Sequence, residues 1–447
     1  MTQITPMPLE AIELLANIVG NENLTTTPAQ LNSGSKDCYH FSPILTPQLD
    51  GRAAEVIAWP TTQEQLVAII SLAARYKIPV TPRGAGTGNY GQGVPLHGGI
   101  LVNTRHLDRI VELTSEYARV EAGAILYNIE KEAEAVGAEL RVFPSTVPTS
   151  SSAGFICGGS GGIGSIEHGM LWEGDNVRGA TVYSIEETPQ RIELDRSEME
   201  GVLHNCGLTA FVSEVEFALA PKTQWNQYIL AFNSLTEALN AGAAFAESPA
   251  RKRLVTAFEW PIPSFFKPLV KKGLVPEGKS CLFIYSDCAI DEIKSFAENV
   301  NGEVTFNEGP HEGKGRGTQI YDYTWNHTTQ WAMKADPSYT YLQDRFEFPK
   351  MHEQIAARKA AFPGEVLEHV EFTKSGGVLQ SGGLTIIKYT TAERLREIID
   401  FSESIDIRVS NPHTYFLNDD SRWYGDKFLE RKSQWDSAGL LNPGHLR

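Results

Sequence analysis

The sequence predicts a mixed α+β protein with more than one domain. The chain has 447 residues, which is more than a single domain usually holds. Apolar residues recur at helical spacing over residues 61–77, and a short strand-like run follows at once at 78–82. After Pro221 the composition shifts and aromatic residues become dense. These observations predict two α+β halves that meet near residue 222.

Caps and breakers place the elements of the first half. The helix over 61–77 begins at a capping box formed by Thr61 and Glu64. A second helix follows a strand that ends at Gly123, and Gly137 stops it. We expect four segments in all: an N-terminal helical extension (1–44), a first α+β domain (45–222), a second α+β domain (223–420) and a C-terminal segment (421–447).

Charge and composition exclude several classes of function. The formal net charge is −16, whereas nucleic acids and anionic membrane surfaces require basic partners. The N-terminus lacks a signal-peptide pattern, and no apolar run reaches the roughly 20 residues that span a bilayer. The five cysteines fit no disulfide or zinc framework. We therefore expect a cytoplasmic protein with reduced thiols, no membrane span and no nucleic-acid partner.

Two glycine-rich loops match the dinucleotide formula G-x-G-x-x-G, at residues 86–91 and 159–164. In a Rossmann turn such glycines open a helix, but Pro95 and Gly98-Gly99 follow the first loop and further glycines follow the second. Tight glycine turns also expose backbone N–H groups that bind anions. Two such loops some seventy residues apart can hold an extended dinucleotide from both sides, and glycine turns without a ligand are the alternative.

Several ordered segments carry a resemblance to a known family. They are PVTPRGAGTG (79–88), the run 143–154 continued to His168-Gly169 and 175–177, GLTAFVSE (207–214) and LNPG (441–444). Together they resemble the vanillyl-alcohol-oxidase superfamily with a PCMH-type FAD-binding domain, and within it the glycolate oxidase D-subunit and D-lactate dehydrogenase group. Ala210, Phe155 and His445 depart from the family pattern, which usually has two glycines and a lysine there.

The resemblance implies a two-subdomain FAD-binding domain, an α+β cap domain for the substrate and a C-terminal tail that returns to the FAD domain. It also implies noncovalent FAD, because Thr87 stands where related enzymes often attach the flavin through histidine. The residues expected to bind FAD are Pro82, Arg83, Gly84, Ala85, Gly86, Thr87, Gly88, Asn89, Tyr90, Pro144, Ser145, Thr146, Thr149, Ser152, Gly154, Gly158, Gly159, Ser160, Gly161, Gly162, Gly164, Phe211, Val212 and Asn442.

The expected chemistry is transfer of a hydride to the flavin from a carbon that bears a hydroxyl group, for example in glycolate or another 2-hydroxy acid. A base must take the hydroxyl proton, and His327 and His413 are the candidates because histidine suits this task near neutral pH. Asn326, Asn411 and Tyr415 are expected to orient the substrate or the edge of the flavin. Arg345 can pair with a substrate carboxylate, and an ion pair with Asp344 or Glu347 is the alternative.

Three questions stay open at the level of sequence. Hydroxyacid dehydrogenases of the resembling group often carry an H-x-G-D-x-N metal motif, which this chain lacks. We expect no metal, with a site formed by His369, Glu371 and His413 as the alternative. A noncatalytic FAD-binding subunit of a larger electron-transfer complex and a nicotinamide-dependent dehydrogenase are the alternative functions. The electron acceptor is unknown, and a partner redox subunit or a homo-oligomer remains open.

Overall fold

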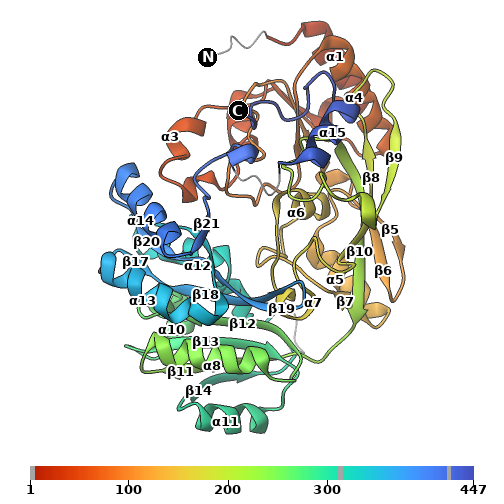
Figure 1. The fold of residues 1–447 in the computed structure, drawn as a ribbon. Coiled ribbons are helices and arrows are strands. Elements are labelled where there is room, and N and C mark those ends of the chain that lie inside the picture. Colours follow the sequence, from red (N-terminus) through yellow and green to blue (C-terminus); the bar gives the residue numbers. More distant parts are fainter. Residues whose placement is uncertain (1–5, 311–315, 420–423) are drawn as a thin grey trace.

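The computed structural model describes residues 6–310, 316–419 and 424–447, and within them the strands form four sheets (Figure 1). The first is a small sheet in the order β1-β2-β4-β3, in which β2, β4 and β3 run parallel. Its strands are β1 (Leu24–Thr25), β2 (Val56–Ala58), β3 (Val80–Arg83) and β4 (Ile100–Asn103).

The second sheet is antiparallel and completes the first half of the chain, in the order β5-β6-β10-β8-β9 with β7 paired to the end of β10. Its strands are β5 (Ile110–Leu113), β6 (Tyr117–Glu121), β7 (Ala138–Leu140), β8 (Val177–Tyr183), β9 (Arg191–Asp195) and β10 (Phe211–Pro221).

The second half is built on an eight-stranded antiparallel sheet in the order β14-β11-β13-β12-β18-β19-β16-β21, with a three-stranded sheet β15-β20-β17 beside it. The strands are β11 (Asn226–Phe232), β12 (Lys252–Phe258), β13 (Ser280–Ser286), β14 (Glu303–Glu308), β15 (Tyr339–Tyr341), β16 (Gln343–Phe346), β17 (Val366–Leu367), β18 (His369–Ser375), β19 (Val378–Gly383), β20 (Ile386–Lys388) and β21 (Arg408–Ser410). We call the eight-stranded sheet the cap sheet.

Helices cover these sheets and connect them. Those of the first half are α1 (Leu9–Val19), α2 (Pro28–Gly34), α3 (Thr46–Leu49), α4 (Gln63–Tyr76), α5 (Leu126–Ala135), α6 (Ser152–Gly158) and α7 (Ser165–His168). Those of the second half and the tail are α8 (Leu235–Glu247), α9 (Ile262–Phe265), α10 (Lys267–Lys271), α11 (Ile290–Asn299), α12 (Asn326–Ala335), α13 (Met351–Ala361), α14 (Ala392–Ser404) and α15 (Asp426–Trp435).

The N-terminal segment belongs to the core of the first half. α1 packs against α4, and Ala11, Leu15 and Val19 on its buried face join the same apolar core as Leu66 and Ile69. Burying such side chains contributes about 1.5–3 kcal/mol each for the larger ones. The predicted helical extension is therefore helical, but its packing ties it to the first sheet, to which it also supplies β1.

The cap sheet buries one face under α8, which packs on β12 and β13 (Figure 1). Gly242 permits this close approach, because a Cβ atom there would lie 2.5 Å from the ring of Phe372. The opposite face of strands β18, β19, β16 and β21 is turned toward the first half of the chain and lines a cavity described below. The sheet thus has one face for packing and one for binding.

The two halves are connected where the sequence predicted a boundary. β10 ends at Pro221, and β11 opens the cap sheet at Asn226. The tail then returns to the first sheet, since the backbone of Val80 bonds to Leu440 and Asn442 over 2.8 and 2.7 Å. The division into four domains stays our proposal, and its last boundary, at 420, lies outside the described residues.

Local structure departs from the sequence predictions at two places. The cap of α4 lies one residue later than predicted, because the Thr62 hydroxyl accepts from the amide of Gln65, while Thr61 donates to the Gln65 side chain. The stretch 144–164, which lacks helical periodicity, contains α6, whose apolar residues Phe155 and Ile156 are buried. No helix follows Gly91 before β4, as predicted, whereas the short helix α7 opens directly after Gly164 and ends before Gly169. Within the described residues no helix is long and apolar enough to cross a membrane.

Candidate functional site

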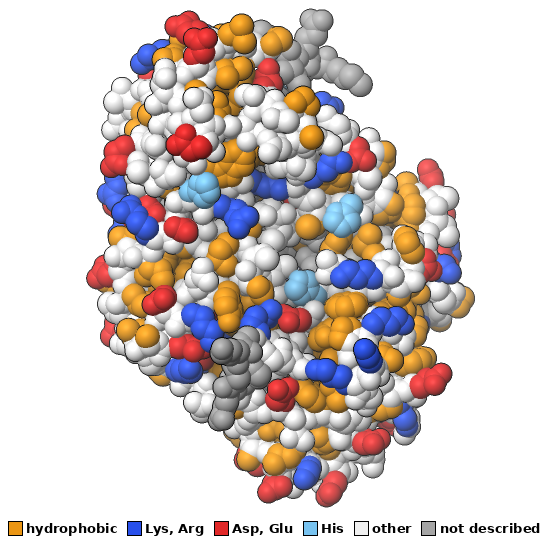
Figure 2. Space-filling model, turned by 180° about the vertical axis from the view of Figure 1, so that it is seen from behind, with side chains coloured by type: hydrophobic (Ala, Val, Ile, Leu, Met, Phe, Trp, Pro, Cys, Tyr) orange, Lys and Arg blue, Asp and Glu red, His pale blue; other side chains and the backbone are white. Residues whose placement is uncertain are grey.

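A cavity of about 1070 Å³ lies between the two glycine loops and the open face of the cap sheet. Ligand sites usually measure about 300–1,000 Å³, so this cavity can hold a large ligand together with a small one. Residues 82–90 and 158–161 line one side, and residues 408–417 together with Arg345 and Glu371 line another. Seen from behind, Lys, Arg and His side chains gather along the hollowed middle of the molecule, although the chain as a whole is acidic (Figure 2).

The first glycine loop is packed directly against the second loop. A Cβ atom on Gly84 would lie 2.0 Å from the hydroxyl of Ser151, and Gly86 adopts a φ of +70°. Neither position accepts a larger side chain without displacing the loops. The glycines therefore bring two backbone segments together at a distance that side chains would prevent.

The Arg83 side chain holds the first loop through hydrogen bonds to backbone oxygens. Its guanidinium donates to the backbone oxygens of Gly93, over 3.1 Å, and of Lys36. Burial lowers the pKa of Arg83, and the neighbouring Asp37 opposes that change. Arg83 is among the residues that we expected to bind FAD. The structure instead directs its N–H groups at loop carbonyls, so that its main role is to hold the loop.

Hydroxyl and amide groups line the gap between the loops. Ser150 Oγ lies 3.0 Å from Thr87 Oγ1 and 2.7 Å from Thr146 Oγ1. Ser151 Oγ and Asn89 Nδ2 also line the cavity, and both are buried without a hydrogen-bond partner among the described residues. Unpaired buried polar atoms of this kind are rare unless a ligand or water pairs them. The donor set suits the phosphates of an extended dinucleotide.

Most residues that we expected to bind FAD line this cavity. They are Pro82, Arg83, Gly84, Ala85, Gly86, Thr87, Gly88, Asn89, Tyr90, Pro144, Ser145, Thr146, Gly154, Gly158, Gly159, Ser160, Gly161, Phe211 and Val212. We keep these residues as our proposed FAD site. Thr149, Ser152, Gly162, Gly164 and Asn442 lie away from the cavity wall.

The five exceptions have structural roles that explain their types. The Ser152 hydroxyl donates to the Glu121 carbonyl over 2.6 Å. Gly164 has a φ of +102°, and a Cβ there would meet the Arg141 carbonyl at 1.9 Å, while Gly162 approaches Phe143 equally closely. The Asn442 amide donates to the carbonyls of Gln92 and Cys206, both over 2.8 Å, which fastens the tail to the first loop. Thr149 caps its own turn through the carbonyl of Thr146.

The cap sheet contributes a row of four residues that lie opposite one another on four neighbouring strands. In the antiparallel register Arg408 of β21 lies opposite Arg345 of β16, Arg345 opposite Gly382 of β19, and Gly382 opposite Glu371 of β18. Residues directly opposite one another point to the same face of a sheet. Gly382 leaves an open space between two guanidinium groups and a carboxylate, and all four residues line the cavity.

Arg345 does not form either ion pair that we considered as alternatives. Asp344 binds Arg358 over 2.7 Å, and Glu347 binds Lys350 over 2.8 Å. Neither the Arg345 nor the Arg408 guanidinium has a hydrogen bond or ion pair with any residue in the described ranges. Burial and the neighbouring Arg408 lower the pKa of Arg345, while Glu173 opposes this. The carboxylate of Glu173 is itself bound by Ser375 and the amide of Gly376.

The two predicted histidines do not present a free nitrogen to the cavity. Both ring nitrogens of His413 are used, since Nδ1 lies 2.7 Å from Ser42 Oγ and Nε2 lies 2.9 Å from the Tyr341 carbonyl. His327 lies behind the cavity wall, and its Nδ1 is buried without a described partner. Burial lowers the pKa of each ring to about 4. The geometry therefore argues against either ring as the base.

Asn411 and Tyr415 line the cavity as expected. The Asn411 side chain accepts from the amide of His413 over 3.0 Å, which shapes the turn after β21. The ring of Tyr415 packs on Phe416, with centroids 4.4 Å apart. Both residues thus form the wall beside Arg408, and a role in orienting a substrate stays our proposal.

Glu371 is held by three donors and is not gathered into a metal site. It accepts from the Trp325 amide over 2.8 Å, from His369 over 2.9 Å and from the Thr256 hydroxyl. Among the described residues, no three His, Cys, Asp or Glu side chains come together as metal ligands. His413 in particular is bound to Ser42 and Tyr341.

Sequence reasoning missed several residues of the cavity, namely Gln343, Glu371 as a lining group, Trp325, Gly382 and Arg408. Trp325 and Asn326 come from the start of α12, and the others come from four different strands of the cap sheet. The only available signal was the alternation of Gln343 and Arg345 along one strand. The partners across the sheet depend on a register that the sequence does not display.

Comparisons with known proteins identify the cofactor of the first half. Residues 54–190 match the model of a family described as an FAD binding domain. This part of the chain is therefore an FAD-binding domain, and FAD is its cofactor, as predicted. The donor-lined gap between the glycine loops fits that group.

The chain is similar to curated flavoproteins over part of its length. It is 25% identical to glycolate oxidase subunit GlcD of Bacillus subtilis over 277 residues, which are 58% of this chain and 57% of that protein. It is 30% identical to D-lactate dehydrogenase of Archaeoglobus fulgidus over 141 residues, 30% of this chain and 31% of that one. The chain spans about half the length, or less, of the curated relatives it matches.

A solved structure shows the same fold over nearly the whole chain. Alkyldihydroxyacetonephosphate synthase superposes with a TM-score of 0.75 at 14% identity, covering 99% of this chain and 86% of that one. This likeness confirms the predicted α+β fold class, with an FAD-binding part of two subdomains.

Proposed function

We propose that the protein is an FAD-dependent oxidoreductase that oxidises the CH–OH group of a small 2-hydroxy acid bound between the FAD loops and the cap sheet. The unpartnered pair Arg345 and Arg408 is the observation that carries this proposal. Relatives named glycolate oxidase subunit, D-lactate dehydrogenase and D-2-hydroxyglutarate dehydrogenase support it, because each name denotes a 2-hydroxy acid.

Two like charges placed directly opposite each other on neighbouring strands destabilise a sheet. Arg345 and Arg408 occupy such positions, and no described acid forms an ion pair with either of them, although Glu173 acts on Arg345 from a greater distance. An anion in the cavity would remove the repulsion, and a guanidinium matches a carboxylate through two parallel N–H···O bonds. The arrangement therefore favours a substrate that carries a carboxylate.

FAD, when bound, supplies the hydride acceptor of such a reaction. The chain's own groups would do the remaining work. Arg345 and Arg408 would fix the carboxylate, and Gly382 beside them would leave room for the body of a short substrate. Glu371 would close the far end of the row, where its charge disfavours a second carboxylate.

Arginine variants of the FAD-loaded protein test the proposal. Arg345→Gln and Arg408→Gln should each raise the concentration of a 2-hydroxy acid that gives half-saturation about 10- to 100-fold. A hydrogen bond to a charged group contributes roughly 1.5–3 kcal/mol, which corresponds to this factor. Arg396→Gln is the matched control, because Arg396 also lines the cavity but is paired with Asp400 over 2.8 Å. The measurement is anaerobic loss of the oxidised flavin absorbance. Equal behaviour of all three variants would contradict the proposal.

A noncatalytic FAD-binding subunit is the second candidate, and the word "subunit" in the name of the glycolate oxidase relative favours it. Turnover of 2-hydroxy acids by the isolated chain with an artificial electron acceptor distinguishes the two. Steady turnover supports the enzyme, whereas an FAD-loaded chain that no 2-hydroxy acid reduces supports the subunit.

A further inference from the structure

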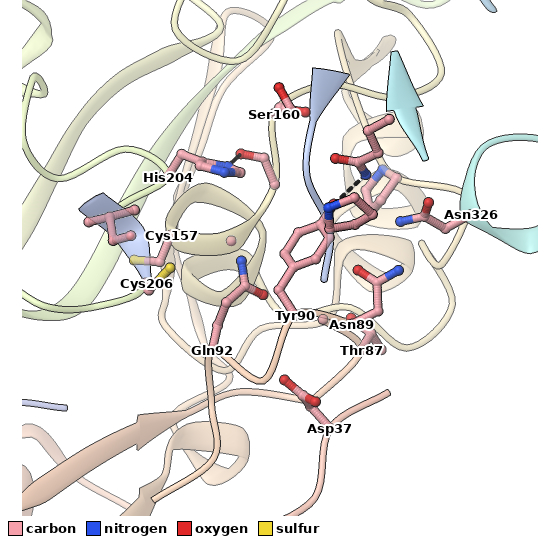
Figure 3. A pocket seen from close by; sticks show the side chains of 18 of the residues that line it. Asp37, Thr87, Asn89, Tyr90, Gln92, Cys157, Ser160, His204, Cys206 and Asn326 are labelled. Atoms are coloured by element: carbon pink, nitrogen blue, oxygen red, sulfur yellow. Dashed lines mark hydrogen bonds between the residues drawn. The ribbon is translucent and has the colours of Figure 1, made fainter. Parts of the chain in front are cut away.

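Polar atoms without partners meet at the junction between the first glycine loop and the second half of the chain. Within the described ranges, Asn89 Nδ2, Trp325 Nε1 and Asn326 Oδ1 are buried and lack a hydrogen bond. Their residues line the cavity together with Tyr90. Figure 3 shows Asn89, Tyr90 and Asn326 converging on one part of it. We call Asn89, Tyr90, Trp325 and Asn326 the polar wall.

The polar wall is held in place by contacts behind it. Trp325 has a φ of +51°, which is unusual for a bulky residue, and its amide donates to Glu371 over 2.8 Å. Glu371 is fixed in turn by His369 and Thr256. A strained backbone held by surrounding bonds is typical of ligand-binding positions. The unpaired atoms of the wall therefore belong to a built surface that requires polar partners from a ligand.

Tyr90 has a hydroxyl proton to offer such a ligand. Gln343 Nε2 donates to its oxygen, a bond drawn as a dashed line in Figure 3. Burial raises the pKa of Tyr90 to about 12, against the effects of Gln343, Asn326 and Tyr341. The phenol is thus protonated at neutral pH. Its oxygen already accepts from Gln343 and interacts with the buried Tyr341 hydroxyl, so a ligand oxygen would compete with Tyr341 for the phenol proton.

The register of β16 relates Tyr90 to the proposed carboxylate site. Gln343 and Arg345 are two residues apart, so they lie on one face of the strand, roughly 6.6–6.8 Å apart along it. Gln343 contacts Tyr90 and Arg345 faces the carboxylate position. A molecule of only a few carbon atoms reaches from one group to the other.

We propose that Tyr90, which we also keep in the proposed FAD site, binds the substrate as well: its hydroxyl donates a hydrogen bond to the oxygen on C2 of the acid whose carboxylate is held by Arg345. This inference rests on the proposed function and extends it, because it names the group that recognises the oxygen to be oxidised. Two contacts at neighbouring carbons fix the orientation of a short acid. Gln343 acts as a positioning residue that holds the phenol.

Binding of two unreactive acids to the oxidised, FAD-loaded protein tests the inference without turnover. Pyruvate carries an oxygen on C2, and propionate has the same chain without it. Both are titrated while the flavin spectrum reports binding. The wild type should bind pyruvate more tightly than propionate. Tyr90→Phe should weaken pyruvate binding about 3- to 10-fold, as expected for one neutral hydrogen bond, and leave propionate binding unchanged.

Two further variants separate substrate contact from a structural effect. Tyr228→Phe is the matched control. Tyr228, on β11 of the cap sheet, does not line the cavity, and its hydroxyl donates to the Cys288 carbonyl. This variant should leave the binding of both acids unchanged. Gln343→Met removes the amide that holds Tyr90 and should weaken pyruvate binding by a smaller factor in the same direction.

The outcomes distinguish this inference from the proposed function. Two results with a Tyr90→Phe protein that keeps its FAD overturn the inference alone. In one, the variant binds pyruvate as tightly as the wild type does; in the other, its affinities for pyruvate and propionate fall by the same factor. A wild type that binds neither acid, and whose flavin no 2-hydroxy acid reduces, overturns the proposed function and this inference with it.

Discussion

The two sides of the cavity recognise ligands by different physical means. The glycine-loop side offers backbone and neutral side-chain donors such as Ser151 and Asn89, and its one buried cation, Arg83, is turned toward its own loop. The cap side presents two unpartnered guanidinium groups, Arg345 and Arg408. The first side suits a large cofactor held by many weak contacts, whereas the second suits a small ion held by a few strong ones.

Gly84→Val is the change with the largest expected effect, and it acts only on the loop side. Its added atoms would overlap Ser151, which already lies 2.0 Å from a Cβ position, so the two loops must separate. We expect purified protein with no bound FAD, measured by its flavin absorbance, and an intact cap sheet. Gly425→Ala is the control, because a Cβ there meets nothing within 4 Å. Full FAD content in Gly84→Val would contradict the described contact between the loops.

Asp37, on the loop side, should make the stability of the folded protein depend on pH, which the cap arginines should not do. Burial raises the pKa of Asp37 from 3.8 to about 6, with Arg83 and the amide of Tyr39 opposing it. The folded state therefore holds this proton more tightly than the unfolded state does. The resulting stability is complete below about pH 4 and is lost as the pH rises to about 6, a change of about 3 kcal/mol.

Asp37→Asn removes that dependence. The free energy of unfolding of the variant, relative to the wild type, should rise between pH 4 and pH 6 and stay level above it. Denaturant titrations of both proteins without FAD, at the same set of pH values, provide the measurement. If the free energy of unfolding of the variant instead falls relative to the wild type as the pH rises, the prediction is wrong. Asp37 would then be ionised and stabilised in the folded loop.

His413 connects the two sides, so its removal should affect stability rather than chemistry. His413→Ala removes the hydrogen bonds of the ring to the Ser42 hydroxyl and the Tyr341 carbonyl, at a cost of about 2 kcal/mol. His413→Gln retains one donor and one acceptor and should recover part of the stability. The rate of flavin reduction at saturating substrate should be similar in both variants. Abolished reduction in both, with FAD bound, would return His413 to the role of the base.

The sequence predicted the glycine-loop side of the cavity better than the cap side. The loop side was recognisable because its residues are contiguous and glycine has few substitutes where backbones meet, as at Gly84 and Gly86. The cap side was recognised only at Arg345. Arg408 and Gly382 join it through strand pairing between distant segments, which leaves no local pattern.

The histidine predictions fail for a related reason. His413 and His327 lie in polar, aromatic stretches that resemble an active site in sequence. The structure shows that the Ser42 hydroxyl, from the other end of the chain, and the Tyr341 carbonyl occupy both nitrogens of His413. Residue type indicated the capacity to move a proton, but only the fold shows which atoms are free to do so. The same applies to Asn442, whose amide fastens the tail instead of facing the cavity.

We propose that the neutral loops hold FAD while the cap arginines select a carboxylate for oxidation. Anaerobic titration of the FAD-loaded protein with a 2-hydroxy acid and with the matching alcohol that lacks the carboxylate, such as lactate and ethanol, tests it most directly. We predict that a 2-hydroxy acid bleaches the flavin and that its alcohol counterpart does not, with the difference lost in Arg345→Gln. Equal bleaching by acid and alcohol in the wild type, or none by any 2-hydroxy acid, would contradict the account.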